Sequence, residues 1–350
     1  MNATESQGQP EARTQAAQIS VIMPVFNGEE YIVHSLPPLI AMRERGEILE
    51  VYMVDDGSTD SSRELAESLG ASVIHSGGRL GPGGARNRAA LVARGDILWF
   101  VDADVVVHAE AANALRAGFS DHEVVAVFGS YDDKPPARNF FSQYKNLVHH
   151  YYHQRAKEEA QTFWSGCGAV RVEAFAAAGG FDVERYKYPS IEDIELGYRL
   201  IQAGGRIRLC RDVQCTHLKV WRFWNLVHTE VLRRAVPWSR LIVTSTGLPN
   251  DLNTGFGEQA RAALSGIFCL SLLLVLLGLA PVPLLPAMLG IVALANLDIT
   301  RLFYQRGGLL FALAALLFHQ VYYLYSATSF VYVILEQAAI RLFGRHTGSA

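Results

Sequence analysis

The chain has 350 residues, of which 50% are hydrophobic and 19% are charged, and its formal net charge is -3. This length allows one large domain with additional elements, or two domains. Because a slightly acidic chain lacks the basic surface that nucleic acids require, we expect no nucleic-acid partner. The four cysteines have neither metal-binding nor disulfide-framework spacing, so we expect reduced thiols.

Residues 1–17 are polar and contain no apolar segment. This composition predicts a disordered N-terminal tail without a cleaved signal peptide. We therefore expect the part of the chain that follows to stay in the cytoplasm.

Strand-like and helix-like segments alternate over residues 18–220, with short links between them. Apolar, β-branched runs predict strands at residues 19–26, 48–60, 72–76 and 96–107. Helices are predicted at residues 29–45 and 61–70, and in the segment that follows the glycine-rich loop from residue 77. This alternation predicts a parallel α/β sheet, which binds ligands at the carboxyl ends of its strands.

The stretch FVDADVVV, residues 100–107, sets Asp102 and Asp104 into an apolar strand pattern. Because an unpaired carboxylate in apolar surroundings is costly, both acids should face a cleft or meet a positive partner. The chain has neither a GxGxxG fingerprint nor a GK[ST] phosphate loop. The remaining way to hold a nucleotide diphosphate is a divalent metal, Mg²⁺ or Mn²⁺, bridging carboxylates and phosphates.

Five short segments appear in a specific order: PVFNGEE, VDDGSTD, GARNRA, GDILWFVDADV and PSIEDIELGYRL. Together they resemble a family 2 glycosyltransferase over roughly residues 18–220. The resemblance implies a GT-A fold, which is a Rossmann-like α/β domain for a nucleotide-sugar donor. It also implies inverting, metal-dependent transfer.

The resemblance assigns roles to residues at matching positions. The nucleotide-binding residues that it implies are Pro24, Phe26, Asp55, Asp56, Arg86 and Asn87. Asp102 and Asp104 match the metal-binding acids, and His217 is a candidate third ligand, although a lone histidine is more often structural. Asp193 matches the general base that takes the proton from the acceptor hydroxyl.

The acceptor side is predicted around residues 161–182, where small residues follow aromatic ones. Gly166 would let a substrate approach the backbone closely, and Trp164 offers a face for a sugar ring. A tight turn with a core tryptophan is the alternative. Glu192, beside the predicted base, completes the predicted acceptor residues.

Two stretches without a charged residue, 262–297 and 307–335, are long enough to cross a bilayer. We predict two to four transmembrane helices over residues 262–340, followed by a tail at 341–350. Arginines precede the first stretch, as the positive-inside rule expects for a cytoplasmic domain. The predicted location is therefore the inner (plasma) membrane, with several passes.

Residues 221–261 are predicted to form an interfacial amphipathic helix and a linker, with tryptophans at the depth of the lipid headgroups. The Gln-x-x-Arg-Trp motif of processive synthases is missing, and Arg233, Arg234 and Trp238 stand in its place. That departure argues against processive synthesis.

The sequence thus predicts a membrane-bound inverting glycosyltransferase. It would move a sugar from a nucleotide-diphosphate sugar to a hydroxyl of a lipid, lipid-linked or glycan acceptor. One open alternative is a polyprenyl-phosphate-directed or processive synthase, although a phosphate acceptor needs little help from a base. The other is a catalytically silent membrane scaffold that binds nucleotide-sugars.

Overall fold

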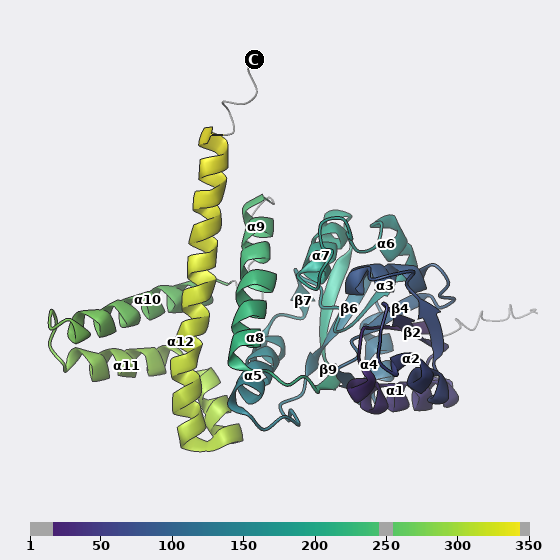
Figure 1. Cartoon of the computed structure of the whole chain (residues 1–350), viewed down its shortest axis with the longest axis horizontal. Coiled ribbons are helices and arrows are strands. Elements are labelled where there is room, and N and C mark those ends of the chain that lie inside the picture. Colours follow the sequence, from purple (N-terminus) through teal and green to yellow (C-terminus); the bar gives the residue numbers. More distant parts are fainter. Residues whose placement is uncertain (1–16, 245–254, 344–350) are drawn as a thin grey trace, which may run out of the picture.

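The structure is a computed structural model that describes residues 17–244 and 255–343. The predicted tails and part of the predicted linker, at residues 1–16, 245–254 and 344–350, lie outside the described residues. A sheet covered by helices forms one side of the molecule, and long C-terminal helices form the other (Figure 1).

The strands form one sheet in the order β3-β2-β1-β4-β8-β6-β9-β5, and β7 pairs with β9. The strands are β1 Ile19–Val25, β2 Glu50–Asp55, β3 Ser72–His75, β4 Ile97–Val101, β5 Val105–Val107, β6 Val124–Tyr131, β7 Glu159–Ala160, β8 Cys167–Arg171 and β9 Arg206–His217. Strands β1 to β4 are parallel, as predicted.

The prediction of an entirely parallel sheet is wrong beyond β4, because β8 runs antiparallel to both β4 and β6. Val101, the last residue of β4, pairs with Cys167, the first residue of β8. The chain therefore enters β8 at the carboxyl end of β4 and must run back along it. The result is a mixed α/β sheet.

The single strand predicted over residues 96–107 is also wrong, because the chain turns between β4 and β5. The backbone N–H of Asp102 donates to the carbonyl of Gly166 at 3.0 Å, and that of Val105 donates to the carbonyl of Asp102 at 3.0 Å. Strand β5 then pairs with β9 instead of continuing β4. The turn places both aspartates at a strand end.

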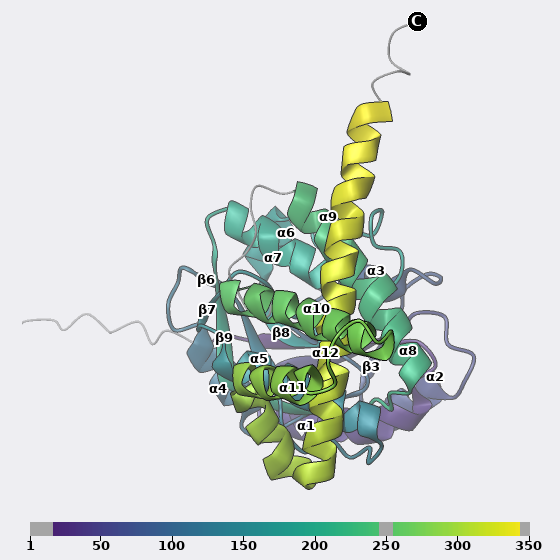
Figure 2. The same ribbon diagram turned by 90° about the vertical axis from the view of Figure 1, so that its left-hand side faces the viewer.

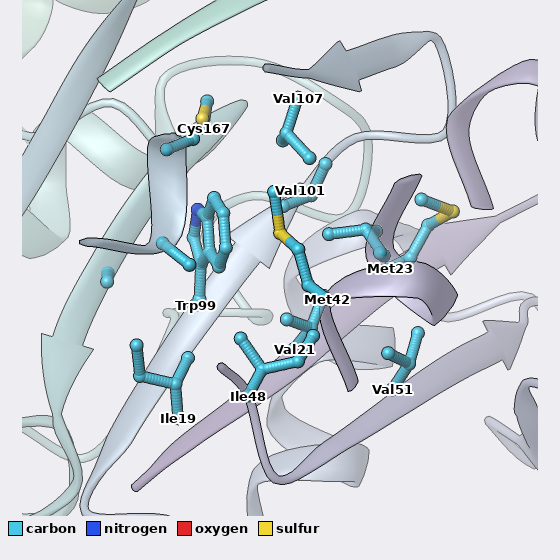
Figure 3. Close-up of a cluster of buried hydrophobic side chains, with 14 of the residues drawn as sticks. Ile19, Val21, Met23, Met42, Ile48, Val51, Trp99, Val101, Val107 and Cys167 are labelled. Atoms are coloured by element: carbon cyan, nitrogen blue, oxygen red, sulfur yellow. The ribbon is translucent and has the colours of Figure 1, made fainter. Parts of the chain in front are cut away.

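Helices cover both faces of the sheet. They are α1 Glu29–Glu44, α2 Ser62–Ser68, α3 Gly81–Ala90, α4 Ala111–Gly118, α5 Phe140–Arg155, α6 Val172–Ala177 and α7 Glu192–Gln202, and α1 to α3 confirm the predicted helices. One core joins α1 to the strands, with Met42 against the apolar residues of β1 and β4 (Figure 3). Its packing fixes the strand ends that carry the acids.

The helical side begins with α8 Phe223–His228, the π-helix η1 Thr229–Ala235 and α9 Val236–Thr244, which follow one another without a break. The tryptophans of this segment do not share one surface. Trp221 is buried, and the indole N–H of Trp238 donates to the Tyr198 hydroxyl, whereas Trp224 is 78% exposed. The prediction that these tryptophans lie together at headgroup depth is therefore wrong for Trp221.

The remaining helices are α10 Phe256–Leu276, α11 Leu284–Ala295 and α12 Leu297–Phe343, and α12 is kinked at Gly308, where φ is 75°. Helices α10 and α11 lie side by side and project away from the sheet, while α12 crosses them and runs beside α9 (Figures 1 and 2). Within the described ranges, α10 and α12 are the two helices long and apolar enough to cross a membrane.

Helix α5 joins the two sides of the molecule. On one side it packs on β6, and on the other Tyr144 and Leu147 pack against Phe303 and Ala315 of α12. The Tyr144 hydroxyl lies 2.8 Å from Nδ1 of His319. The sheet and the apolar helices are thus held together through α5.

Candidate active site

A cavity of about 1360 Å³ opens at the carboxyl ends of β1 and β4 and extends to α9, α10 and α12. It is lined by many of the residues that the sequence predicts for the site: Pro24, Phe26, Arg86, Asp102, Asp104, Trp164, Glu192 and Asp193. The other predicted residues, Asp55, Asp56, Asn87, Gly166 and His217, lie behind this lining. The structure therefore gathers the predicted donor, base and acceptor residues around one space.

Asp102 meets a positive partner, as its apolar setting required. Nη2 of Arg86 donates to Oδ1 of Asp102 at 2.5 Å, and Nη1 of Arg86 lies 3.8 Å from Oε1 of Glu192. Burial raises the pKa of Asp102, and the nearby Asp104 and Asp193 raise it further. The Arg86 guanidinium is itself buried, with Nε and Nη1 lacking a hydrogen bond.

Asp104 lies beside His217, with 3.6 Å between Oδ2 of the carboxylate and Nε2 of the imidazole. Burial alone would raise the pKa of Asp104, but His217 and Lys219 outweigh it and the pKa is lowered. The His217 ring also stacks on Tyr131, with ring centroids 4.4 Å apart. His217 thus lies behind the cavity lining, between Asp104 and the Tyr131 ring.

The two aspartates suit a divalent metal because carboxylate oxygens are the ligands that Mg²⁺ and Mn²⁺ prefer. No three His, Cys, Asp or Glu side chains in the described part of the chain come together as a complete ligand set. A metal held here would thus need the substrate diphosphate and water as further ligands, as is usual for these ions.

The predicted base, Asp193, is fixed by the backbone of the neighbouring loop. Its Oδ2 accepts hydrogen bonds from the backbone N–H of Ser165 at 3.0 Å and from the Ser165 hydroxyl at 3.3 Å. Ser165 precedes Gly166, whose carbonyl binds the backbone N–H of Asp102. Two adjacent residues therefore hold the base and the predicted metal-binding turn.

Glu192 is almost completely buried next to Asp193. Its Oε2 accepts a hydrogen bond from the backbone N–H of Ser190 at 2.7 Å. Burial and the charge of Asp193 raise the pKa of Glu192 to about 7. A carboxyl whose pKa is raised this far inside a cavity is typical of functional sites.

The predicted nucleotide-binding acids organise loops behind the cavity. Asp55 accepts a hydrogen bond from the backbone N–H of Ser58 at 2.8 Å. The Asp56 carboxylate accepts hydrogen bonds from the backbone N–H groups of Leu80 and Gly81, at 2.8 and 2.9 Å. The second acid of VDDGSTD therefore fixes the glycine-rich loop at the start of α3.

Phe26 and Asn87 differ in their availability to a ligand. Phe26 lines the cavity, with the Arg79 guanidinium 3.4 Å from the centre of its ring. Asn87 is engaged with the backbone of Phe181, donating to its carbonyl at 2.8 Å and accepting from its N–H at 2.9 Å. Asn87 thus ties α3 to the loop before α7.

Trp164 forms part of the cavity wall, where it packs edge-on against Tyr131 and close to His149 and His153 of α5. Gly166 is needed for this packing, because a Cβ there would lie 2.6 Å from the indole ring. The space at Gly166 is therefore filled by Trp164 rather than open to a substrate, which corrects the reason we gave for this glycine.

Most of the sheet-containing part of the chain matches a known protein family. Residues 20–179 match the model described as "Glycosyl transferase family 2". The chain carries a family 2 glycosyltransferase domain. The motifs that gave the resemblance lie within this match, except for PSIEDIELGYRL at residues 189–200.

Solved structures confirm the predicted GT-A fold of the glycosyltransferase domain. The mannosyltransferase PcManGT from Pyrobaculum calidifontis, in complex with GDP-Man and Mn²⁺, has a TM-score of 0.57 at 21% identity and covers 91% of this chain and 88% of its own. GalNAc-T7 with UDP, GalNAc and Mn²⁺ has a TM-score of 0.50 at 18% identity, covering 66% and 48%. At these identities the likeness concerns the fold alone.

Curated relatives are also glycosyltransferases. Glycosyltransferase AglD of Haloferax volcanii is 29% identical over 272 residues, which is 68% of this chain and 42% of the relative. Glycosyltransferase GlyG of Streptococcus pneumoniae is 28% identical over 118 residues, which is 32% of this chain and 38% of the relative. The chain thus spans less than half the length of these relatives.

Beyond the glycosyltransferase motifs, the cavity has residues to which the sequence assigned no role at the site. Ser165, which holds the base, follows the noted Trp164. Lys145 lies on α5, and Glu230 and Arg234 lie on η1. One signal was present, because Lys145 is the only Lys, Arg, Asp or Glu between residues 140 and 154 in a segment rich in aromatic residues.

Proposed function

We propose that the chain is a membrane-associated, metal-dependent, inverting glycosyltransferase. It moves a sugar from a nucleotide-diphosphate sugar to a hydroxyl of a lipid or lipid-linked acceptor. One observation carries the proposal: Asp102, Asp104 and Asp193 line the same cavity in a chain with a family 2 glycosyltransferase domain.

The donor is proposed to lie at the strand ends. Asp102 and Asp104 would hold Mn²⁺ or Mg²⁺ with the diphosphate, and the metal would supply charge stabilisation for the leaving group. Pro24 and Phe26 would border the base, and Asp56 would keep the glycine-rich loop in place beside it. The Mn²⁺ and nucleotide-sugar named for the neighbour PcManGT support this reading.

Asp193 is proposed to act as the general base. Its carboxylate takes the proton from the acceptor hydroxyl while that oxygen bonds to the anomeric carbon. The bond from the anomeric carbon to the diphosphate breaks in the same displacement, so the configuration inverts. Ser165 holds Asp193 in position through two hydrogen bonds.

The acceptor is proposed to come from a membrane. Helices α10 and α12 are long and apolar enough to cross one, and the cavity reaches both. Large apolar side chains are exposed on these helices, among them Ile267, Leu270, Leu273, Leu310, Leu313 and Leu317. We place the chain in the inner (plasma) membrane with the glycosyltransferase domain in the cytoplasm.

The test is nucleotide-diphosphate release by the full chain in nanodiscs, with Mn²⁺ or Mg²⁺ and a panel of UDP-, GDP- and dTDP-sugars. A lipid extract supplies the acceptor. We expect release from one donor only with both metal and lipid, and loss of release in Asp193→Asn and Asp104→Ala. The exposed acid Asp212, outside the cavity, gives the control Asp212→Asn, which should match the unmodified protein.

Two results would contradict the proposal. Binding of a donor with metal, without turnover under any lipid condition, would favour the silent scaffold. Release that is unchanged by EDTA would remove the metal from the reaction. Inversion itself is checked by the anomeric proton coupling in the NMR spectrum of the product.

A further inference from the structure

A cluster of charged side chains lies in the cavity wall away from the strand ends. Nζ of Lys145, on α5, is 2.7 Å from Oε2 of Glu230, and Nη1 of Arg234 is 3.6 Å from Oε1 of the same residue. The Tyr325 hydroxyl of α12 donates to Oε2 of Glu230 at 3.2 Å. All four side chains line the cavity.

This cluster has more positive than negative charge. Although burial opposes ionisation of Glu230, Lys145 and Arg234 lower its pKa, so it remains a carboxylate. One carboxylate therefore serves two cations. Two further cations, Lys219 and Arg233, line the same cavity. By contrast, the opposite wall presents three aspartates, with Arg86 paired to Asp102 and Lys219 acting on Asp104.

A purely structural salt bridge between α5 and η1 would need only one cation. Lys145 makes the shorter contact with Glu230, and its side chain is 14% exposed. The Arg234 side chain is 44% exposed and makes the longer contact, so its guanidinium remains available to a ligand in the cavity. It lies on a π-helix, a form often found at functional sites.

The cluster lies between the proposed base and an apolar region. Arg234 and Asp193 line the same cavity. Burial lowers the pKa of Arg234, but Glu230 and, to a smaller extent, Tyr131 and Asp193 raise it. Beyond the cluster, the lining includes a set of apolar and small residues, beside polar ones such as Glu258 and Thr328. The apolar and small residues are Ile242 of α9, Ala262, Ala263 and Gly266 of α10, and Phe330, Val331 and Leu335 of α12. The small residues of α10 leave room for a chain.

We propose that Lys145 and Arg234 bind the phosphate-type group of an amphiphilic acceptor whose apolar chain lies among α9, α10 and α12. The inference rests on the proposed function, since it describes the acceptor of that reaction. The reacting group would lie at Asp193, the anion at the cluster, and the chain along the apolar lining. A ligand with an anionic head and an apolar tail would place its charge at the cations and its tail along the apolar residues.

The test uses the full chain in nanodiscs of neutral lipid that contain a photoreactive alkyl phosphate or the matching photoreactive alcohol. The measurement is the ratio of crosslinking by the two probes, with the crosslinked peptides identified by mass spectrometry. We expect the phosphate to crosslink about tenfold more than the alcohol, as one charge-assisted contact of about 1.4 kcal/mol would give. Crosslinks should fall on α10 and α12.

Arg234→Gln should bring the ratio of phosphate to alcohol crosslinking close to one. The double variant Lys145→Met, Glu230→Gln removes both charges of the buried Lys145–Glu230 pair and should lower the ratio. Arg222→Gln is the matched control, because Arg222 is exposed and outside the cavity. The inference is overturned if the unmodified chain shows no preference, or if Arg234→Gln keeps it. It is also overturned if inorganic phosphate competes as well as the alkyl phosphate, which would indicate a soluble anion.

Binding of nucleoside diphosphates with Mn²⁺ is measured on the same nanodiscs by calorimetry. If this binding is absent while the phosphate preference remains, the proposed function fails and the anion site stands. If nucleotide binds but the preference is absent, the proposed function stands and the inference fails. The two failures are therefore distinguishable.

Discussion

The two walls of the cavity are built in different ways. The strand-side wall, formed by Phe26, Arg86, Asp102, Asp104 and Asp193, comes from strand ends and short motifs. The helix-side wall comes from α5, η1, α9, α10 and α12. In the strand-side wall, the acids are held by backbone groups, Arg86 and His217. In the helix-side wall, the cations Lys145 and Arg234 share one carboxylate beside apolar helices.

The two walls separate the residues proposed for the transfer reaction from those proposed to bind the acceptor. The strand-side wall has the carboxylates that we propose for sugar transfer, and most of it lies within residues 20–179, which match the family model. On the helix-side wall, Glu230, Arg234 and Tyr325 lie outside that match. We infer that the family reaction is set by one wall and the choice of acceptor by the other.

The strongest test of the strand-side wall is Asp193→Asn. The amide oxygen can still accept the hydrogen bonds from Ser165, but it cannot take a proton. We expect the turnover number to fall by about 10²–10⁴-fold, the usual contribution of a general base. Donor affinity, measured by calorimetry, should be unchanged. A loss of donor binding equal to the loss of turnover would contradict the role.

Asp104→Asn should weaken Mn²⁺-dependent binding of the nucleoside diphosphate by about 100-fold, in the upper range for losing a partner around a metal site. The measurement is calorimetry with and without Mn²⁺. Asp212→Asn serves as the control. Equal affinity in Asp104→Asn and the control would exclude Asp104 as a ligand.

Gly166→Ala probes the packing that joins the walls. The added methyl group would lie 2.6 Å from the Trp164 ring, so the indole must move. We expect the free energy of unfolding to fall by about 1–3 kcal/mol, as for other overpacked sites. Chemical denaturation followed by tryptophan fluorescence measures the change. A stability equal to that of the unmodified chain would show that the indole can relax freely.

Glu192 should make stability depend on pH. Its pKa is about 7 in the folded chain and near 4.5 when unperturbed. Between these values the folded state binds more protons than the unfolded state, so stability present below about pH 4.5 is lost as the pH rises through 7.

The expected loss between pH 5 and pH 7.5 is on the order of 2 kcal/mol, smaller than the full shift because an unfolded glutamate is already partly ionised at pH 5. Denaturation midpoints at pH 5 and pH 7.5 should differ less in Glu192→Gln than in the unmodified chain. Glu173→Gln, at an exposed position of α6, is the control. Parallel pH dependence in all three proteins would contradict the raised pKa.

The smallest effect is expected where α5 meets α12. Tyr144→Phe removes the hydroxyl that lies 2.8 Å from the His319 ring but keeps the aromatic packing. We expect a loss of about 1 kcal/mol, or about 2–4 °C in the thermal midpoint. A larger loss, with α12 becoming sensitive to proteases, would show that this one bond holds the helix in place.

Local patterns made much of the strand-side wall predictable. The β-branched runs before Asp55 and Asp102 predicted the strands. The acids at the ends of these runs predicted a cleft at the strand ends. Two features were not predictable from local patterns. The turn at Asp102 depends on the carbonyl of Gly166, and the direction of β8 depends on where the chain enters the sheet. Both depend on contacts between distant segments.

The helix-side wall could not be predicted in the same way. Lys145, Glu230 and Tyr325 are far apart in the sequence and meet only because α5, η1 and α12 pack together. Segment 221–244 reads as amphipathic, but the pattern does not say that Trp221 faces protein rather than lipid. Side-chain packing between helices decides such positions, and it leaves little trace in composition.

Ser165 and Gly166 have a consequence for the geometry of the reaction. The N–H of Ser165 holds Asp193 at 3.0 Å, and the carbonyl of Gly166 holds the backbone of Asp102 at 3.0 Å. One short loop thus contacts both the proposed base and the proposed metal-binding turn. A change in backbone conformation at either residue is expected to move these two groups relative to one another.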